Sequence, residues 1–288
     1  DIERTDYLLI LGANPGASNG SLLTAPGFSQ KIKNIQKRGG EVINIDPRYT
    51  ETSKISSNHF FINPGKDALL LLSLLHVIFE QGINEKTHLS NHLKGLSEIK
   101  EIVKKYPPQK TASIIGINGF EIQKIAKDFM KSETAVCYGR MGVSTQEFGG
   151  ICQWLINVIN IVTNNMDKVG GAMFTKPAID LVFMTGMQGK VGNFDRYRSR
   201  VHDLPEYSGE LPVATLADEM LVKGEGQIKM LICTAGNPVL STPNGKKLEK
   251  ALEQLDYMVS IDIYLNETSK YANIILPSTN GLETLHYD

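Results

Sequence analysis

The sequence lacks paired cysteines, an excess of charge of either sign and long apolar runs. Its three cysteines, Cys137, Cys152 and Cys233, form no CxxC pair, which leaves no disulfide framework and no cysteine-based zinc or iron–sulfur site within these 288 residues. A net charge of −1 argues against nucleic acid or a membrane surface held by bulk electrostatics. The longest apolar run, residues 68–79, is shorter than the roughly 20 residues that cross a bilayer, so it predicts a buried helix and no membrane span.

Several common site motifs are also missing. The early glycines do not fit G-x-G-x-x-G, and no G-x-x-x-x-G-K-[ST] occurs, which disfavours a plain NAD site and excludes a P-loop. His88 and His92 have the spacing of zinc ligands on a helix but no third ligand nearby, so we expect surface histidines. Without a signal-peptide pattern we expect a cytoplasmic location. Because the sequence starts at Asp1, we expect a fragment of a longer polypeptide.

What is present indicates an α/β protein. Continuous apolar runs such as YLLIL, from Tyr7, are typical of strands buried on both faces of a parallel sheet. Further strands are predicted at 41–45, 59–65 and 134–142, and helices at 27–38, 66–81, 118–132 and 147–165. This order predicts a doubly wound, Rossmann-like parallel sheet.

The pattern breaks between about 175 and 213 and then resumes. Helices are predicted at 214–223 and 244–254, and strands at 228–238, 257–267 and 272–278. We therefore expect two Rossmann-like α/β units with the following boundaries: a first domain at 1–180, an irregular basic connecting segment at 181–213, and part of a second domain at 214–288. No repeat of fixed period is evident.

Polar corners recur where the predicted strands end. GANP (12–15), DPR (46–48) and GNP (236–238) follow strands, as do Asp262 and the loop GRMGVSTQ (139–146). Ligands of open α/β sheets bind at the carboxyl ends of strands. A single DPR or GNP is most often a simple turn. Their recurrence indicates two nucleotide-sized sites, one in each half.

In the order GANP … IDPRYTETSK … PGKDALLLL … YGRMGVSTQ … GGAMF … AGNPVLS … VSIDIYLNETSKYANIILPSTNGLE, the chain resembles the molybdopterin oxidoreductases of the dimethyl-sulfoxide-reductase superfamily, which include formate dehydrogenases and nitrate reductases. The resemblance implies the two central domains of such an enzyme, which hold a bis(molybdopterin guanine dinucleotide) cofactor with molybdenum or tungsten. It implies two-electron redox chemistry on a small substrate.

Carried over residue by residue, the resemblance assigns parts of the cofactor to positions in this sequence. Gly12 and Asn14 would approach the phosphates of one dinucleotide. The following residues would contact its guanosine: Asp46, Arg48 and Asp67. The second dinucleotide would be held by Gly236, Asn237, Ser241, Asp262, Glu267 and Thr268. The loop that begins at Gly139 would bring Met141 and Gln146 near the pterins.

The resemblance also indicates what lies outside these residues. Members of the family usually take their protein ligand to the metal from upstream of the first strand, and many carry a [4Fe–4S] cluster there. We therefore name no catalytic residue and no metal ligand within this sequence, and expect a small-molecule substrate and an electron-transfer subunit as partners.

The basic segment offers one hypothesis about the substrate. Lys190, Arg196, Arg198 and Arg200 would form a positive patch that attracts an anion such as formate or nitrate. The alternative is a solvated linker whose charges have no specific role.

Two other functions stay open. One is a non-catalytic scaffold subunit of an electron-transfer complex, which kept the fold and lost the metal. The other is an unrelated nucleotide-binding α/β protein. Bound guanine nucleotide would distinguish the enzyme from both.

Overall fold

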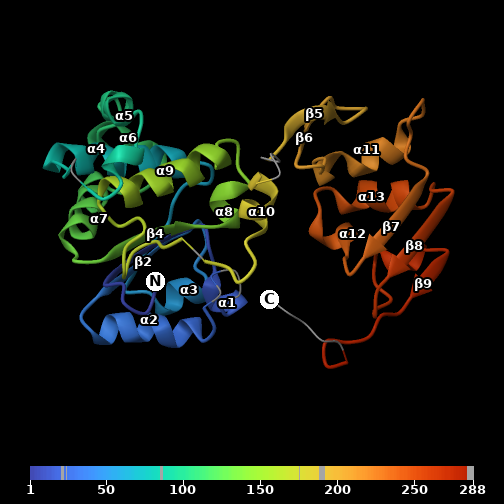
Figure 1. The fold of residues 1–288 in the computed structure, drawn as a ribbon, viewed down its shortest axis with the longest axis horizontal. Helices are drawn as coiled ribbons and strands as arrows, with labels where there is room; N and C mark the ends of the chain where they lie inside the picture. Colours follow the sequence, from blue (N-terminus) through green and yellow to red (C-terminus); the bar gives the residue numbers. More distant parts are fainter. Residues whose placement is uncertain (21–22, 24, 85–86, 175, 188–191, 284–288) are drawn as a thin grey trace. The chain divides into compact units, whose positions relative to one another are not determined.

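The computed structural model describes residues 1–20, 23, 25–84, 87–174, 176–187 and 192–283. The chain divides into two compact units, Asp1–Lys176 and Pro177–Asp288, called here the first and second unit (Figure 1).

The first unit is built on a four-stranded parallel sheet with the order β3-β2-β1-β4. The strands are β1 (Tyr7–Leu11), β2 (Glu41–Ile45), β3 (Asn58–Phe60) and β4 (Ala135–Gly139). All five residues of β1 are buried, as expected for a central strand with helices on both faces. The chain runs outward from β1 to β3 and returns to β4 on the other side of β1, which places a reversal of strand order between β1 and β4.

Helices of one face form the larger core. They are α4 (Asp67–Gln81), α7 (Gly119–Lys131) and α9 (Gly149–Val162), with η2 (Ser90–His92), α5 (Leu96–Val103) and α6 (Pro108–Ile115) between α4 and α7. Figure 1 shows α4, α7 and α9 on the opposite side of the strands from α2 (Phe28–Lys37). Helix α4 is apolar almost all round and buried, which confirms the buried helix predicted from its sequence.

The other face carries two short helices beside α2. These are α1 (Pro15–Ser18) and α3 (Glu51–Ile55). Helix α3 begins with a capping box, in which Thr50 and Ser53 exchange side-chain and backbone hydrogen bonds. Short helix α8 (Met141–Ser144) follows β4 directly.

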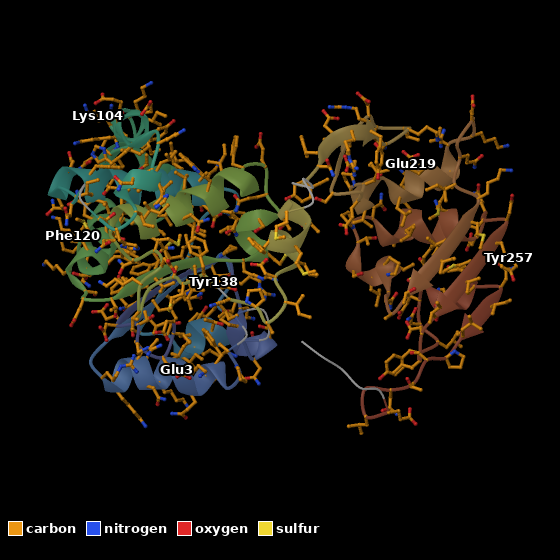
Figure 2. The ribbon with its side chains drawn as sticks, in the orientation of Figure 1. Glu3, Lys104, Phe120, Tyr138, Glu219 and Tyr257 are labelled. Atoms are coloured by element: carbon orange, nitrogen blue, oxygen red, sulfur yellow. The ribbon has the colours of Figure 1, made fainter. Side chains whose placement is uncertain are left out.

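The second unit contains a three-stranded parallel sheet with the order β7-β8-β9. Its strands are β7 (Met230–Thr234), β8 (Tyr257–Ile261) and β9 (Ile274–Leu276), and its helical elements are η3 (Val213–Thr215), α11 (Leu216–Leu221), α12 (Pro238–Ser241), α13 (Gly245–Leu252) and η4 (Ser269–Tyr271). Leu231 and Met258 pack with α11 and α13 on one face. The alternate residues Met230 and Ile232 are exposed on the other face, as is Tyr257, which is labelled in Figure 2.

The segment 181–213 is more regular than predicted. It contains α10 (Leu181–Met187) and an antiparallel pair, β5 (Phe194–Arg198) and β6 (Pro205–Tyr207). No apolar period marks the pair because all five residues of β5 are exposed. The side chains that join the two strands are the ion pair of Arg196 with Glu206 and the edge-to-face contact of Phe194 with Tyr207. Sequence reasoning based on apolar periodicity could not detect it.

The structure also bears on the predicted fold class, the membrane span and the histidine pair. The predicted α/β class with parallel sheets is confirmed. Within the described residues, no helix is long and apolar enough to cross a membrane. His88 and His92 are both exposed, and no group of three metal-ligating side chains occurs among the described residues.

Candidate functional site

The first unit has a cavity of about 370 Å³ at the carboxyl ends of its strands. Its walls come from the ends of β1 and β2, the loop before α4 and the segment around α8: Gly12, Asp46, Pro47, Arg48, Pro64, Gly65, Asp67, Gly142, Thr145 and Gln146. The cavity therefore lies where the strand order reverses, the usual ligand position in such sheets.

The loops that follow β1 and β4 meet at this cavity, and their close backbone contact requires glycine. At Gly12 the backbone has φ +51°, and a Cβ would lie 2.7 Å from the nitrogen of Val143 and 2.9 Å from Gly142. The N–H of Gly142 donates to the carbonyl of Gly12 at 2.8 Å. Glycine at 12 and 142 thus lets the loops after β1 and β4 touch and close one side of the cavity.

Two buried carboxylates face this cavity. Asp46 accepts a hydrogen bond from the backbone N–H of Arg48 at 2.8 Å. Asp67 accepts one from the side-chain amide of Gln146 at 2.8 Å. Burial raises the pKa of Asp67 above its ordinary value, and the Gln146 bond opposes that rise only in part. A ligand with N–H groups would supply the hydrogen bonds that a buried carboxylate needs.

Arg48 is the positive group of the same cavity. Its side chain is exposed, and within the described part of the chain its guanidinium makes no hydrogen bond or ion pair. A free guanidinium can stack on a planar base or pair with a phosphate. The donor and acceptor set of the cavity thus suits a ligand that has both a base with N–H edges and an anionic part.

The second unit has a similar cavity, of about 420 Å³, at the corresponding strand ends. It is lined by Ala235, Gly236, Asn237, Asp262, Ile263, Tyr264 and Asn266. Asp262 is buried, and its carboxylate accepts the backbone N–H of Tyr264 at 3.0 Å and the amide of Asn266 at 3.0 Å.

The same pattern of hydrogen bonds occurs in each unit and supports the cavity of that unit. The amide of Asn14 donates to Glu51 at 2.7 Å, and that of Asn237 donates to Glu267 at 2.7 Å. The same asparagines accept from a threonine hydroxyl, at 2.9 Å in the first unit and 2.8 Å in the second. Each of these threonines, Thr52 and Thr268, also accepts a backbone N–H at the start of the helix that follows the asparagine.

This network reveals an internal repeat that the sequence analysis misses. Ile45 pairs with Phe60 and Ile261 with Leu276, so residues 45–60 align without a gap onto 261–276. The signal was visible as ETSK, which occurs at 51–54 and again at 267–270. Because two distant copies produce no fixed period, periodicity alone does not detect this repeat. The repeat adds Glu51 and Thr52 to the structure of the first site.

Some predicted site residues support the cavities without lining them. Asn14, Glu267 and Thr268 are engaged in the network just described. The Oγ of Ser241 donates to the backbone carbonyl of Asn237 at 3.0 Å, within its own helix.

Residues of the loop after β4 divide in the same way. Gly139 permits close packing, since a Cβ there would lie 2.4 Å from the Cδ1 of Ile156. Met141 is exposed and does not line the first cavity. Gln146, expected near the pterins, contacts Asp67 in that cavity.

The basic segment does not form a free positive patch. Arg196 pairs with buried Glu206 at 2.6 Å, Arg198 with Asp195 at 2.8 Å, and Arg200 with Glu219, labelled in Figure 2, at 3.3 Å. Each of these three charges is therefore compensated within the chain. The hypothesis that the segment attracts an anionic substrate stays a prediction. Lys190 lies outside the described residues.

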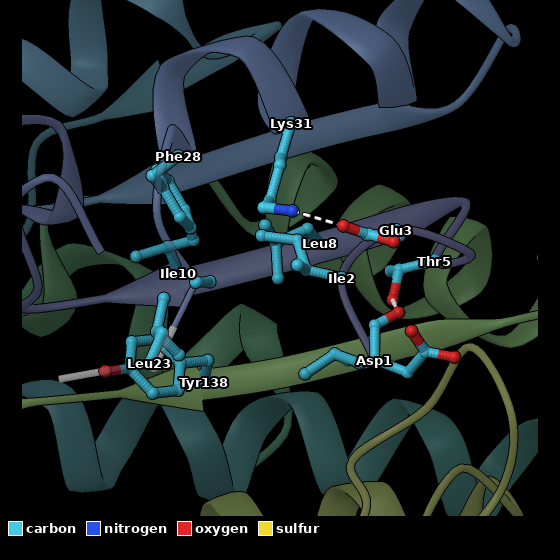
Figure 3. Close-up of a pocket in the computed structure, with 12 residues that line it drawn as sticks. Asp1, Ile2, Glu3, Thr5, Leu8, Ile10, Leu23, Phe28, Lys31 and Tyr138 are labelled. Atoms are coloured by element: carbon cyan, nitrogen blue, oxygen red, sulfur yellow. Dashed lines mark hydrogen bonds and ion pairs between the residues drawn. The ribbon is translucent and has the colours of Figure 1, made fainter. Parts of the chain in front are cut away.

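A further hollow of about 300 Å³ lies away from the strand ends, beside α2 (Figure 3). Its floor is apolar, from Leu8, Ile10 and Tyr138, and an ion pair between Lys31 and Glu3 lies at its edge. It contains none of the predicted cofactor residues.

Comparison with known families agrees with the geometry of the strand ends. A family model described as molybdopterin oxidoreductase matches residues 1–285. The chain belongs to this family.

Relatives of the chain include enzymes with different substrates. It is 30% identical to the F420-dependent formate dehydrogenase subunit alpha of Methanocaldococcus jannaschii, over 96% of this chain and 42% of that protein. It is 28% identical to the assimilatory nitrate reductase catalytic subunit of Bacillus subtilis, over 98% of this chain and 41% of that protein. The chain thus spans less than half the length of these molybdopterin oxidoreductases.

A solved structure of similar fold is acetylene hydratase from Pelobacter acetylenicus. The TM-score is 0.77 at 22% identity, with 99% of this chain and 42% of that chain covered. At this identity the likeness concerns the fold alone.

The residues present fit the nucleotide ends of a molybdopterin cofactor. Asp46 and Asp67 are buried carboxylates of one cavity, and Asp262 is buried in the other. Guanine presents N–H donors on one edge, and a ribose presents two hydroxyls, which such carboxylates accept.

Proposed function

We propose that this chain is the cofactor-binding core of a molybdenum or tungsten enzyme that holds two molybdopterin guanine dinucleotides and carries out two-electron redox chemistry on a small substrate. The observation that carries the proposal is the repeat: each unit supports a cavity with a buried carboxylate on the same asparagine–threonine–glutamate network. Two similar cavities match a cofactor with two similar nucleotide ends.

In this proposal the residues of the chain bind and orient the cofactor. Asp46 and Asp67 would accept hydrogen bonds from one guanosine, with Arg48 against its base or phosphates. Asp262 would do the same for the second guanosine. The cofactor, when bound, supplies the electron transfer at its metal, while the protein supplies position and electrostatics. No residue of this chain is assigned a proton-transfer or ligand role at the metal.

Substrate and partner follow from the relatives only in outline. Formate dehydrogenase and nitrate reductase relatives act on small anions by name, and several are designated as alpha subunits. We propose a small-molecule substrate and an electron-transfer subunit as partners. A [4Fe–4S] cluster would have to be held by residues outside this chain, because the three cysteines here are Cys137 and Cys152 in the core and the half-buried Cys233.

The alternative of a scaffold without metal is less well supported. Burial raises the pKa of Asp67, which means that burying this ionised carboxylate is unfavourable in the absence of a ligand. A scaffold has no need of such a group, whereas a guanine site does.

The test is the composition of the full-length protein purified under anaerobic conditions. Molybdenum and tungsten would be measured by mass spectrometry, and GMP would be measured after acid hydrolysis. We expect about one metal and two GMP per chain, the ratio of a bis-dinucleotide cofactor. Protein with neither metal nor GMP would contradict the enzyme and favour the scaffold. NAD or a single nucleotide per chain would contradict the proposal of two molybdopterin guanine dinucleotides.

A further inference from the structure

Arg48 and Tyr264 occupy the same position in the two copies of the repeat. Each lies two residues after the buried aspartate at its strand end, and each donates its backbone N–H to that aspartate's carboxylate, at 2.8 Å and 3.0 Å. Each lines the cavity of its own unit. The loop geometry is therefore the same, and only the side chain differs.

Tyr264 combines an exposed aromatic side chain with a position beside a buried carboxylate. Its side chain is 67% exposed, and no hydrogen bond of its hydroxyl occurs within the described residues. Its backbone, in contrast, is fixed, because its N–H donates to Asp262 and its carbonyl accepts from Ser269 at 3.0 Å. An exposed aromatic ring is thus held on a fixed loop that lines the cavity beside the buried carboxylate of Asp262.

We propose that Tyr264 is the base-stacking residue of the second site, in the role that Arg48 has in the first. This inference rests on the proposed function, since the ligand is the guanine end of the second dinucleotide. A phenol ring and a guanidinium are both flat and both stack on a purine. They differ in charge, because arginine also attracts phosphate whereas tyrosine contributes only stacking and one hydroxyl.

The difference gives binding at the two sites a different dependence on salt. At the first site, Arg48 adds electrostatic attraction for the anionic part of the ligand, and this attraction weakens with added salt. At the second site, Tyr264 binds through the face of the base, which salt affects little. Loss of one base–aromatic stack weakens binding roughly 5- to 150-fold.

The experiment uses the full-length protein loaded with cofactor. Tyr264→Ala, Tyr264→Phe and the neighbouring control Leu265→Ala are compared; Leu265 is 77% exposed and does not line the cavity. Each protein is incubated in urea below its unfolding transition, and the GMP that stays bound is measured against time. We expect GMP loss about tenfold faster in Tyr264→Ala than in the parent, with Tyr264→Phe and Leu265→Ala at the parental rate.

Fluorescence gives a second measurement that does not require loss of the cofactor. Tyr264→Trp and Leu265→Trp are each compared with the parent, in loaded protein and in protein from cells that cannot make the cofactor. Stacking on guanine quenches indole emission, so the added emission of Trp at 264 should fall on loading by a larger factor than that at 265.

The outcomes are distinguishable. Equal quenching at both positions, or a parental rate of GMP loss in Tyr264→Ala, would overturn the role of Tyr264 while two GMP per chain upheld the proposed function. A parent protein without GMP would overturn the proposed function itself, and this inference with it.

Discussion

In the first unit helices lie on both faces of the sheet, whereas in the second unit the described residues cover one face and leave the other exposed. Leu9 of β1 is 1% exposed, and Ile232, its counterpart on β7, is 59% exposed. The strand ends are nevertheless alike in both units, down to the hydrogen bonds of Asn14 and Asn237. The comparison shows that the site geometry depends on a local network and not on how the sheet is covered.

The largest expected difference between the units concerns their apolar residues. Leu9→Ala should lower the free energy of unfolding of this chain by about 2–5 kcal/mol, because it opens a cavity in a packed core. Ile232→Ala should lower it by less than about 1 kcal/mol, because that side chain is already exposed. Urea unfolding of both variants checks this. Similar losses would mean that the exposed face is packed in solution.

Loss of the threonine hydroxyl from the asparagine–threonine–glutamate network should destabilise both units to a similar extent. Thr52→Val and Thr268→Val each remove a fully buried hydroxyl that donates to an asparagine and accepts a backbone N–H. Each substitution should lower the free energy of unfolding by about 1–3 kcal/mol, since it leaves a buried donor or acceptor unsatisfied. The transition of each unit is to be followed separately by hydrogen exchange. Unequal losses would show that the repeat is not energetically equivalent.

A smaller effect on stability is expected at the position where the first unit has Gly12 and the second unit has Ala235. Ala235 has φ +47°, close to the φ +51° of Gly12, its counterpart. This conformation is unfavourable for a residue with a Cβ, so Ala235→Gly should raise the free energy of unfolding by about 1 kcal/mol. The matched change Gly12→Ala should lower it, because its Cβ would clash with Val143. Thermal unfolding measures both, and a loss in Ala235→Gly would refute the argument.

The smallest effect is local and depends on pH. Hydrogen bonds from the guanidinium of Arg196 hold the pKa of Glu206 at about 2, below its ordinary value of 4.5. A carboxyl group whose pKa is lower in the folded state stabilises the fold at pH values above the pKa it has in the unfolded state. This contribution is lost as the pH falls through the folded-state pKa of about 2. The amides of Arg196 and Gly209, which donate to Glu206, should therefore exchange faster as the pH falls from 4.5 to 2, after correction for intrinsic rates. Glu206→Gln, as control, should show no such pH dependence.

Much of the fold could be predicted from the sequence, because apolar periodicity determines which residues are buried. The β2 strand and helices α4 and α7 lie within a residue or two of their predicted bounds. The β5–β6 pair could not be predicted, since all five residues of β5 are exposed and the buried residue of β6 is a charged one, Glu206, which pairs with Arg196.

The site was predicted in position more than in detail. Polar residues at strand ends identified Asp46 and Asp262, because carboxyl ends of parallel strands meet at one edge. Sequence alone could not show that Asn14 and Asn237 use their amides within the protein, or that Gln146 contacts Asp67 from a distant loop. Those features depend on contacts between segments far apart in the chain.

The central claim is that each unit holds one guanine at its strand ends. The most direct test is a crystal structure of the full-length protein with its cofactor. The account predicts one guanosine within hydrogen-bond distance of Asp46 or Asp67 and a second within hydrogen-bond distance of Asp262. A structure with only one nucleotide, or with its bases bound away from these carboxylates, would contradict it.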